Sequence, residues 1–403
     1  MTSALTAGLR QAAGGVVVVG AAAAGIATVE ALRRKGYAGP IRLVGAEQHL
    51  PYDRPPLSKT LLDGDPALDH LALRTADELG TLDISMHLGV RATSVDAGAR
   101  RVRLSDGDEL AYEHLVVATG VKPRQLPVAA GITGVHYLRT LDDARGLRDE
   151  LVPDRRIVVV GGGLVGTEIA SVAAEAGLHV HLLHRGDGLL DGAGIGGEVE
   201  AWLRGLHTAR AVDVRTGPAA QVTGVEQQHN ALTGVVLADG TRIAADLLLV
   251  AIGAEPCVDW LRSVDGLDLT DGVRCDAYLR AAPGISAVGD VCSWSDPRTG
   301  KVVRIEHRTN ATEQGVYVAD MIVNGPTAPF TTVPYFWTEQ CGTTLHAYGS
   351  LRGHDEARVV HGAFEEGRFV VAYLRDNRLV GVLGVRSAKV LRRWRASLEA
   401  GEP

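Results

Sequence analysis

A run of glycines at the start of a predicted helix could bind the phosphates of a dinucleotide. The glycines follow the short apolar strand Ile157–Val160 and match the pattern G-x-G-x-x-G completely. In such a turn the first glycine allows a tight bend, the second lets the backbone approach a pyrophosphate, and the third lets helix pack on strand. The sequence therefore predicts a dinucleotide site here, made by Gly161, Gly163, Leu164, Val165 and Gly166.

An earlier turn has the same outer glycines but an alanine in the middle. Gly20 and Gly25 follow the strand Val16–Val19, and Ala22 stands where the middle glycine is expected. Its methyl carbon, about 1.5 Å from Cα, faces the place where a phosphate comes closest. The turn indicates either a second dinucleotide site, with Ala24 on its helix, or an ordinary buried turn without a ligand.

The residues that follow the next strand could select between nucleotides. An acidic side chain there holds the adenosine ribose, whereas a basic one suits a 2′-phosphate. Glu47 is the nearest carboxylate in the first repeat, while the second repeat ends its strand with His184 and Arg185 and has no acid at that place. This difference favours NADPH slightly over NADH, unless Arg185 is simply a solvated loop residue.

The elements that position the two turns are alike. Each repeat has a buried strand, a glycine turn, a helix and a further apolar strand, Ile41–Val44 or Val180–Leu183. This order is typical of a right-handed βαβ crossover. Alternating segments beyond each repeat, Val102–Leu104 and Val235–Gly240, predict antiparallel hairpins. We therefore expect an α/β protein with two Rossmann-like nucleotide-binding domains, each of three ββα layers.

The C-terminal part has a different pattern. Two prolines interrupt the chain, and the segments Phe369–Leu374 and Leu379–Leu383 then predict two strands around the turn Asp376-Asn377. A final helix follows these strands. We therefore predict a third, α+β domain.

Composition excludes several other classes of protein. The 403 residues suffice for two or three domains, and 46% apolar with 22% charged residues is typical of a soluble globular protein. A net charge of −7 with interspersed signs gives no reason to expect nucleic acid as a partner. The four cysteines lie far apart without a C-x-x-C pair, so we expect neither a metal centre nor a redox dithiol.

The apolar run Val16–Ala27 follows Arg10 and could also be read as part of a signal peptide. A strand and a nucleotide-binding turn explain the same residues better. No other run reaches the ~18 apolar residues of a membrane span. We therefore expect a cytoplasmic protein with no membrane partner.

A longer motif resembles a known family. The segment Leu50–Lys59, L-P-Y-D-R-P-P-L-S-K, is similar to that of the FAD-dependent ferredoxin reductases of bacterial oxygenase and cytochrome P450 systems, relatives of the glutathione reductase fold. The match runs from about residue 15 to about 385. It includes the further motifs Ala118-Thr119-Gly120 with Arg124, Ala251-Ile252-Gly253, Ala287–Asp290, Glu306–Gly315 and Pro334–Trp337.

The resemblance implies a discontinuous FAD domain. In that family the chain leaves the FAD domain near Gly120 for an inserted NAD(P) domain and returns near Asp246. The implied domains are an FAD domain of residues 1–120 and 246–325, an NAD(P) domain of residues 121–245 and a C-terminal α+β domain of residues 326–403.

The resemblance also implies roles for charged residues. Asp290 would hydrogen-bond the ribityl chain of FAD, while Arg54 and Arg124 would hold the flavin and its phosphates. Lys59 and Glu168 would meet beside the flavin ring, where a buried ammonium favours the anionic reduced flavin and the glutamate compensates it otherwise. Alternatively, Lys59 is a surface residue after a proline turn.

Two positions where the family has tryptophan complete the predicted site. The resemblance places Trp337 near the flavin edge, where it could define the exit for electrons, although a core aromatic is an equal alternative. Arg308 stands where the family usually has tryptophan, so flavin or nicotinamide packing could differ. The predicted catalytic residues are Lys59, Glu168 and Trp337, and the predicted cofactor-binding residues are Gly20, Ala22, Ala24, Gly25, Glu47, Arg54, Lys59, Ala118, Thr119, Gly120, Arg124, Asp290, Trp337, Gly161, Gly163, Leu164, Val165, Gly166, His184, Arg185, Ile252 and Gly253.

These residues predict hydride transfer from NAD(P)H to FAD, followed by single-electron transfer to an iron-sulfur ferredoxin. The first cysteine is Cys257, so the thiol that accepts electrons in cysteine-dependent relatives is missing. Ferredoxins are acidic, and the basic residues of the last predicted helix are a candidate docking surface or simply a solvated face. We expect a monomer or a homodimer.

Two other functions remain open at this point. One is an NAD(P)H-dependent flavin oxidase or quinone-type reductase. The other is a non-catalytic, nucleotide-dependent interaction protein resembling apoptosis-inducing factor, since a fold can outlive its chemistry.

Overall fold

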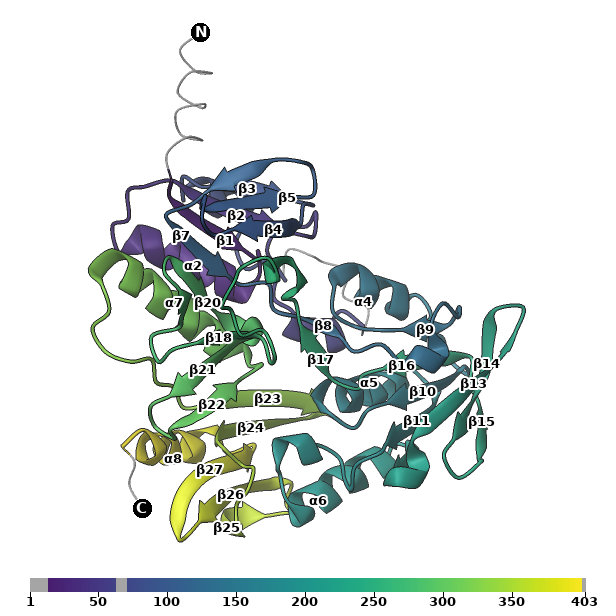
Figure 1. Ribbon diagram of the computed structural model, residues 1–403. Coiled ribbons are helices and arrows are strands. Elements are labelled where there is room, and N and C mark those ends of the chain that lie inside the picture. Colours follow the sequence, from purple (N-terminus) through teal and green to yellow (C-terminus); the bar gives the residue numbers. More distant parts are fainter. Residues whose placement is uncertain (1–13, 63–70, 401–403) are drawn as a thin grey trace. The chain divides into compact units, whose positions relative to one another are not determined.

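The computed structural model describes residues 14–62 and 71–400 (Figure 1). The predicted domains also include residues 1–13, 63–70 and 401–403, which lie outside the described residues. The chain forms two compact units: the first comprises Met1–Asp53, Ala67–Lys122 and Glu255–Thr332, and the second Arg54–Pro66, Pro123–Ala254 and Val333–Pro403. Two of the boundaries fall within the short strands β8 (Val121–Pro123) and β17 (Ala254–Pro256).

The first unit contains a six-stranded sheet with the order β19-β20-β7-β1-β2-β3. Its strands are β1 (Val16–Val19), β2 (Ile41–Gly45), β3 (Ser85–Leu88), β7 (His114–Val117), β19 (Arg280–Ala282) and β20 (Ile285–Ala287). All neighbours run parallel except β19, and the predicted strand, crossover helix and strand at the N-terminal end are confirmed. Within this unit, α2 (Ala23–Arg34) and α7 (Arg308–Asn324) pack against each other.

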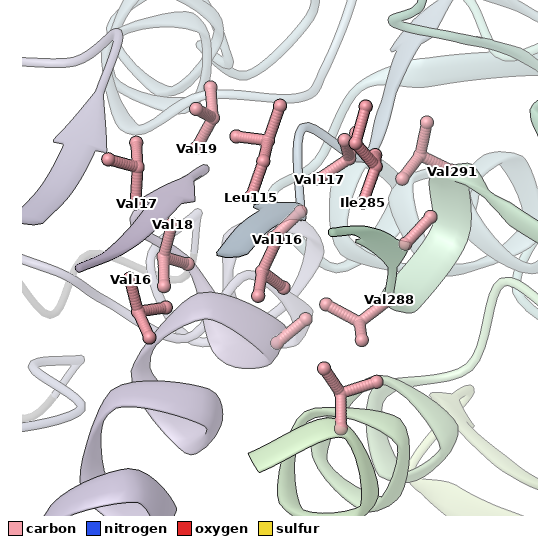
Figure 2. Packing of buried hydrophobic residues seen from close by; sticks show 14 of the residues in the cluster. Val16, Val17, Val18, Val19, Leu115, Val116, Val117, Ile285, Val288 and Val291 are labelled. Carbon is pink, nitrogen blue, oxygen red and sulfur yellow. The ribbon is translucent and has the colours of Figure 1, made fainter. Parts of the chain in front are cut away.

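Buried valines form the centre of the first unit. Figure 2 shows Val16–Val19 of β1 beside Val116 and Val117 of β7, with Ile285 and Val288 nearby. Residues Val16–Val19 are between 0% and 3% exposed, so both faces of β1 are covered. Both faces being buried explains why this strand is a continuous apolar run rather than an alternating one.

The second unit contains a five-stranded parallel sheet with the order β12-β11-β10-β16-β9. Its strands are β9 (Val135–His136), β10 (Arg156–Val160), β11 (His179–His184), β12 (Asp213–Thr216) and β16 (Leu247–Val250), and its helices are α4 (Leu141–Arg148), α5 (Leu164–Glu175) and α6 (Gly197–Thr208). The second predicted repeat is therefore confirmed, and the α/β fold class is confirmed with it.

An antiparallel sheet of five strands also belongs to the second unit, in the order β23-β24-β27-β26-β25. Its elements are β23 (Tyr335–Gln340), β24 (Thr343–Gly349), β25 (Glu356–Ala363), β26 (Arg368–Arg375), β27 (Arg378–Val385) and the helix α8 (Ala388–Ala400). The predicted hairpin is confirmed, since Asp376 and Asn377 both have positive φ in its turn. Three further strands were not predicted. Leu345 and Phe369 of this sheet share a core with Ile169 of α5.

Smaller sheets complete both units, and the two predicted hairpin regions are confirmed. The first unit adds α3 (Ala76–Gly80), β4 (Ala92–Asp96), β5 (Arg101–Leu104), β6 (Glu109–Ala111), β18 (Val273–Cys275), β21 (Cys292–Asp296) and β22 (Lys301–Arg304), and the second adds β13 (Val222–Gln228), β14 (Ala231–Leu237) and β15 (Arg242–Ala244). The sheets that these strands form are antiparallel except for the parallel pair β18–β21. Within residues 14–62 and 71–400, no helix is both long enough and apolar enough to span a bilayer.

Candidate functional site

The first glycine turn is closed tightly by its neighbours. Gly20 has φ +124°, and a Cβ atom added there would lie 2.0 Å from the carbonyl oxygen of Ala118. A Cβ atom on Gly25 would lie 1.9 Å from the carbonyl oxygen of Gly20. Only glycine fits these two positions. At Gly20 the positive φ and the Ala118 carbonyl both exclude a side chain, whereas at Gly25 the close approach of the helix to the turn alone excludes one.

The second turn repeats this geometry with different residues. Gly161 has φ +119°, and its added Cβ would lie 2.1 Å from the carbonyl oxygen of Ala251. A Cβ atom on Gly166 would lie 1.9 Å from the carbonyl oxygen of Gly161. The motifs that contain Ala118 and Ala251 follow β7 and β16, which pair with β1 and β10, so each turn is bounded by the same type of neighbouring segment.

The middle position of each turn is not constrained by the backbone. Ala22 is the N-cap of α2 with φ −117° and ψ −160°, and Gly163 is the N-cap of α5 with φ −80° and ψ −175°. Both are extended conformations that any residue adopts. A Cβ atom added to Gly163 meets nothing within 4 Å. The middle position therefore faces open space at the start of the helix, where a ligand would lie.

Both helices begin without a side-chain cap. Neither alanine nor glycine can accept a hydrogen bond through its side chain, and the first turns of α2 and α5 contain no acidic residue. By contrast, α3 and α4 begin with complete capping boxes, Thr75 with Glu78 and Thr140 with Asp143. The N–H groups at the start of α2 and α5 are thus left for an external acceptor. Two dinucleotide phosphates fit this arrangement.

The carboxyl end of β2 carries the acid that the sequence predicted. The hydroxyl group of Tyr52 donates a hydrogen bond to the Glu47 carboxylate. A Cβ atom on Gly45, the last residue of β2, would lie 2.8 Å from the Cβ atom of Ala21. Glu47 is therefore held in place next to the first turn, in a position that suits the ribose of an adenosine.

The carboxyl end of β11 also has an acid nearby, contrary to the sequence prediction. Asp191, from the 3₁₀ turn Asp191–Ala193, lies with its Oδ1 atom 3.1 Å from His184 Nε2. A Cβ atom on Gly186 would lie 1.9 Å from Asp191 Oδ2, so this carboxylate occupies the space of a side chain at residue 186. The sequence pattern did not predict Asp191 at this place, because the residue returns to the end of β11 through a loop. Arg185 is exposed.

Asp290, which the resemblance implies as a partner of the FAD ribityl chain, follows a glycine that packs beside the start of α2 in the first unit. It belongs to the 3₁₀ turn Gly289–Val291, and a Cβ atom on Gly289 would lie 3.1 Å from the Cβ atom of Ala24. The N–H group of Gly289 donates to Gln314 Oε1 at 2.7 Å, which ties this turn to α7. Burial lowers the pKa of His307, at the N-cap of α7, to about 4, although Asp290 opposes the shift.

The neighbouring loops of the first unit are pinned by specific hydrogen bonds. Thr119 Oγ1 donates to the carbonyl oxygen of Cys257 at 2.8 Å, and the N–H group of Cys257 donates to the carbonyl oxygen of Gly120 at 3.0 Å. Arg308, where the family usually has tryptophan, forms an ion pair with Asp53. Its charge is thus matched by a residue of the L-P-Y-D-R-P-P-L-S-K segment.

Lys59 and Glu168 form a buried ion pair in the second unit. Lys59 Nζ lies 2.9 Å from Glu168 Oε2, and their side chains are 13% and 5% exposed. Ser58 Oγ donates to Glu168 Oε2 at 2.5 Å, and Thr338 Oγ1 donates to Glu168 Oε1 at 2.7 Å. Each carboxylate oxygen therefore has a partner, which offsets the cost of burying the charge. The alternative of a surface lysine does not hold.

Ser58 and Thr338 were not among the predicted site residues. Ser58 stands inside the recognised motif, so its contact could have been suspected from the sequence. Thr338 follows Trp337 on β23, and strand alternation places the two side chains on opposite faces. Trp337 stacks on Tyr335 with ring centroids 5.9 Å apart, so it lies on the other face of β23 from the hydroxyl that reaches Glu168.

Further predicted residues lie at loops and helix starts of the second unit. Arg54 Nη1 donates to the carbonyl oxygen of Arg139 at 2.5 Å, and Arg124 Nε donates to that of Ala254 at 3.2 Å. Val165 and Ile252, near the second turn, are 40% and 37% exposed, which leaves apolar surface where a nucleotide would bind.

Comparison with known proteins agrees with this architecture. The pyridine nucleotide-disulphide oxidoreductase family matches residues 14–315, and the reductase C-terminal family matches residues 335–403. The chain therefore belongs to the pyridine nucleotide-disulphide oxidoreductase family. It is an oxidoreductase that uses FAD and NAD(P)H.

Individual relatives narrow the comparison. Putidaredoxin reductase CamA of Pseudomonas putida is 37% identical over 374 residues, covering 91% of this chain and 87% of the relative. The benzene 1,2-dioxygenase system ferredoxin--NAD(+) reductase subunit of Pseudomonas putida is also 37% identical over 374 residues, covering 92% and 88%. The reductase in the covalent putidaredoxin reductase-putidaredoxin complex matches with TM-score 0.90 and 35% identity, covering 96% and 93%. The predicted resemblance to ferredoxin reductases is thereby confirmed.

Proposed function

We propose that this protein is a ferredoxin reductase of an oxygenase or cytochrome P450 system. It would take hydride from NAD(P)H onto FAD and pass single electrons to an iron-sulfur ferredoxin. The names of its relatives support this function. The observation that carries it is the buried Lys59–Glu168 pair, in a chain that has no cysteine before Cys257 to receive the electrons.

Bound FAD supplies an acceptor that takes two electrons at once and can release them singly. We propose that Lys59 presents its ammonium to the reduced flavin and that Glu168 balances this charge otherwise. Burying an ammonium group without a partner is costly, so Glu168 would keep Lys59 in its charged form for interaction with the flavin.

We assign the nucleotides by the two turns. FAD would bind at the N-terminus of α2, with Glu47 on its ribose and Asp290 on its ribityl chain. NAD(P)H would bind at the N-terminus of α5. The domain boundaries at residues 120, 245 and 325 and the oligomeric state, monomer or homodimer, stay predictions.

We propose that NADH is preferred over NADPH. Asp191 supports this choice, because its carboxylate lies at the end of β11 where a 2′-phosphate would be repelled and ribose hydroxyls would be accepted. The Asp191→Asn variant should raise kcat/KM for NADPH relative to NADH, measured with ferricyanide as the electron acceptor. An unchanged ratio would overturn the role of Asp191.

The partner would be an acidic iron-sulfur ferredoxin docking on α8. Lys389, Arg392, Arg393 and Arg395 of this helix are all exposed, and Arg395 also lies 5.4 Å from the centre of the Tyr348 ring. Complementary charge mainly accelerates association and improves specificity. Reversal of Arg392 and Arg393 to glutamate should raise the KM for ferredoxin and leave ferricyanide reduction unchanged. The matched control is Arg242→Glu, on the separate β15 hairpin.

The function is tested by supplying acceptors to NADH-reduced protein under anaerobic conditions. A [2Fe-2S] ferredoxin from an oxygenase system should be reduced much faster than a quinone, and oxygen added separately should consume little NADH. Rapid turnover with oxygen or quinone and no gain from ferredoxin would instead identify an oxidase or quinone reductase.

A further inference from the structure

A chain of buried polar side chains leads away from Glu168. Thr338 Oγ1 donates to Glu168 Oε1 at 2.7 Å, and Gln340 Nε2 donates to Thr338 Oγ1 at 3.0 Å. Gln340 Oε1 then lies 2.8 Å from His207 Nε2. The four residues are at most 4% exposed. The chain therefore runs through the interior of the second unit, out of contact with water.

Three elements build this chain. Thr338 and Gln340 share one face of β23 because strand side chains alternate, Glu168 belongs to α5, and His207 belongs to α6. A second contact ties the end of β23 to α5, since the N–H group of Cys341, the residue after the strand, donates to Ser171 Oγ at 2.7 Å. The strand is thus held at two points of the same helix, which fixes the distance across which Thr338 reaches Glu168.

The hydrogen atoms in this chain can point in only one direction while Glu168 is ionised. A carboxylate only accepts, so the single hydroxyl hydrogen of Thr338 must go to Glu168. Thr338 Oγ1 then accepts from the amide group of Gln340, which turns the amide oxygen of Gln340 toward His207. His207 must therefore carry a hydrogen on Nε2.

The surroundings of His207 agree with this assignment. Burial and the nearby Arg210 guanidinium lower the pKa of His207, so the ring is neutral and has one N–H hydrogen. Within the described residues, His207 Nδ1 has no hydrogen-bond partner. The one hydrogen is therefore placed on Nε2, where an acceptor exists, and Nδ1 is left bare.

We propose that His207, Gln340 and Thr338 are positioning residues whose one-way hydrogen bonds hold Glu168 as an ionised acceptor for Lys59. This inference rests on the proposed function for the role of the Lys59–Glu168 pair. Its consequence is that the charge at Glu168 and the position of the hydrogen on His207 are coupled across three hydrogen bonds.

Glu168→Gln should reverse the whole chain. Lys59 and Ser58 both donate toward Oε2 of residue 168, so they would hold the amide oxygen of the new glutamine and turn its NH₂ group toward Thr338. Thr338 would then donate to Gln340, whose NH₂ group would turn to His207 Nε2. The hydrogen of His207 would move to Nδ1.

The experiment reads the tautomer of His207 directly. Holoprotein labelled with ¹⁵N-histidine is measured by imidazole ¹H–¹⁵N NMR at pH 7.5, and the His207→Gln variant assigns the signal. We expect the Nε2–H tautomer in the unmodified protein and the Nδ1–H tautomer in Glu168→Gln. The same tautomer in both proteins would overturn the chain.

A second pair of variants keeps the inference testable if Glu168→Gln does not fold. Thr338→Val removes the hydroxyl group at nearly constant volume, and Thr338→Ser retains it. Thr338→Val loses a hydrogen bond to a charged group, so we expect its hydride-transfer rate to fall about tenfold while the KM for NADH stays unchanged. Thr338→Ser should keep the rate within about twofold of the unmodified protein. Thr344→Val, on the neighbouring strand β24, is the matched control.

The outcomes separate the two proposals. If Thr338→Val lowers only the unfolding temperature, with an unchanged hydride-transfer rate and an unchanged flavin midpoint potential, Thr338 is merely structural and the inference fails. If Glu168→Gln keeps the full hydride-transfer rate, the proposed role of the Lys59–Glu168 pair fails, whereas the His207 tautomer still decides whether the chain exists.

Discussion

The two glycine turns have nearly the same backbone conformation, but their side chains fill the neighbouring space from different elements. In the first, a methyl group on Ala21 meets Gly45 at the end of β2; in the second, the His184 ring at the end of β11 meets Gly162. A Cβ atom added to either glycine would lie 2.8 Å from its neighbour. In each repeat, the residue after the first glycine and the residue that ends the next strand therefore fill one space between them. In the first repeat the turn residue carries the side chain, and in the second repeat the strand residue carries it.

The same comparison explains why Ala22 is tolerated. The outer glycines of both turns are required by the protein itself, because an added Cβ atom would collide with backbone carbonyl oxygens. The middle residue has extended φ and ψ in both turns and faces open space in the second. The protein itself does not constrain this position, so Ala22 is compatible with the fold, and we propose that its methyl group acts through nucleotide binding.

The largest effects are expected from Gly20→Ala and Gly161→Ala. Each should lower the free energy of unfolding by about 2–3 kcal/mol, since positive φ and a backbone collision both oppose the methyl group. Gly20→Ala should also lose FAD, while Gly161→Ala should keep FAD and lose NADH binding. Urea unfolding, flavin absorbance and NADH titration measure these changes. Loss of FAD from Gly161→Ala alone would reverse the nucleotide assignment.

An acidic N-cap should separate helix stability from nucleotide binding. Ala22→Asp would cap α2 and raise the free energy of unfolding of the flavin-free protein by about 1 kcal/mol. The same carboxylate would repel the pyrophosphate and weaken FAD binding by about a hundredfold. Gly163→Asp should act likewise on NADH and spare FAD. If either variant binds its nucleotide normally, the phosphate does not lie at that helix.

A double-mutant cycle tests the exchange of bulk in the second repeat. Gly162→Ala should cost about 1–2 kcal/mol of unfolding free energy, because the new methyl group meets the His184 ring. His184→Gly should remove the collision, so that the double variant is more stable than the sum of the single changes by about 1 kcal/mol. Additive changes in urea unfolding would show that the two positions do not share one volume.

The smallest effect is expected at the middle positions. Ala22→Gly removes one methyl group next to the phosphate and should tighten FAD binding by no more than about fivefold, equivalent to ~1 kcal/mol. Gly163→Ala should weaken NADH binding by a similar factor. Fluorescence titration of each nucleotide measures both changes. A hundredfold gain for Ala22→Gly would mean that Ala22 seriously obstructs FAD.

The sequence predicted what depends on local pattern. Apolar runs such as Val16–Val19 and Ile157–Val160 are buried strands, and the glycine spacing located both turns, because each signal lies within a few consecutive residues. The Lys59–Glu168 pair came from the family resemblance and not from the spacing of the two residues, which are far apart in the chain.

The sequence did not predict contacts that depend on long-range packing. Asp191 reaches the end of β11 through a loop, and Thr338 reaches Glu168 only because β23 packs on α5. The packing of Leu345 and Phe369 into the core around α5 was not predicted for the same reason. The alternation of side chains in a strand does not indicate which helix the strand will cover.

The most direct test of the account is the absorption spectrum of the purified protein, followed by anaerobic titration with NADH. Two dinucleotide turns predict a yellow protein with about one FAD per chain that is bleached by about one equivalent of NADH. A colourless protein that does not take up added FAD would contradict the account.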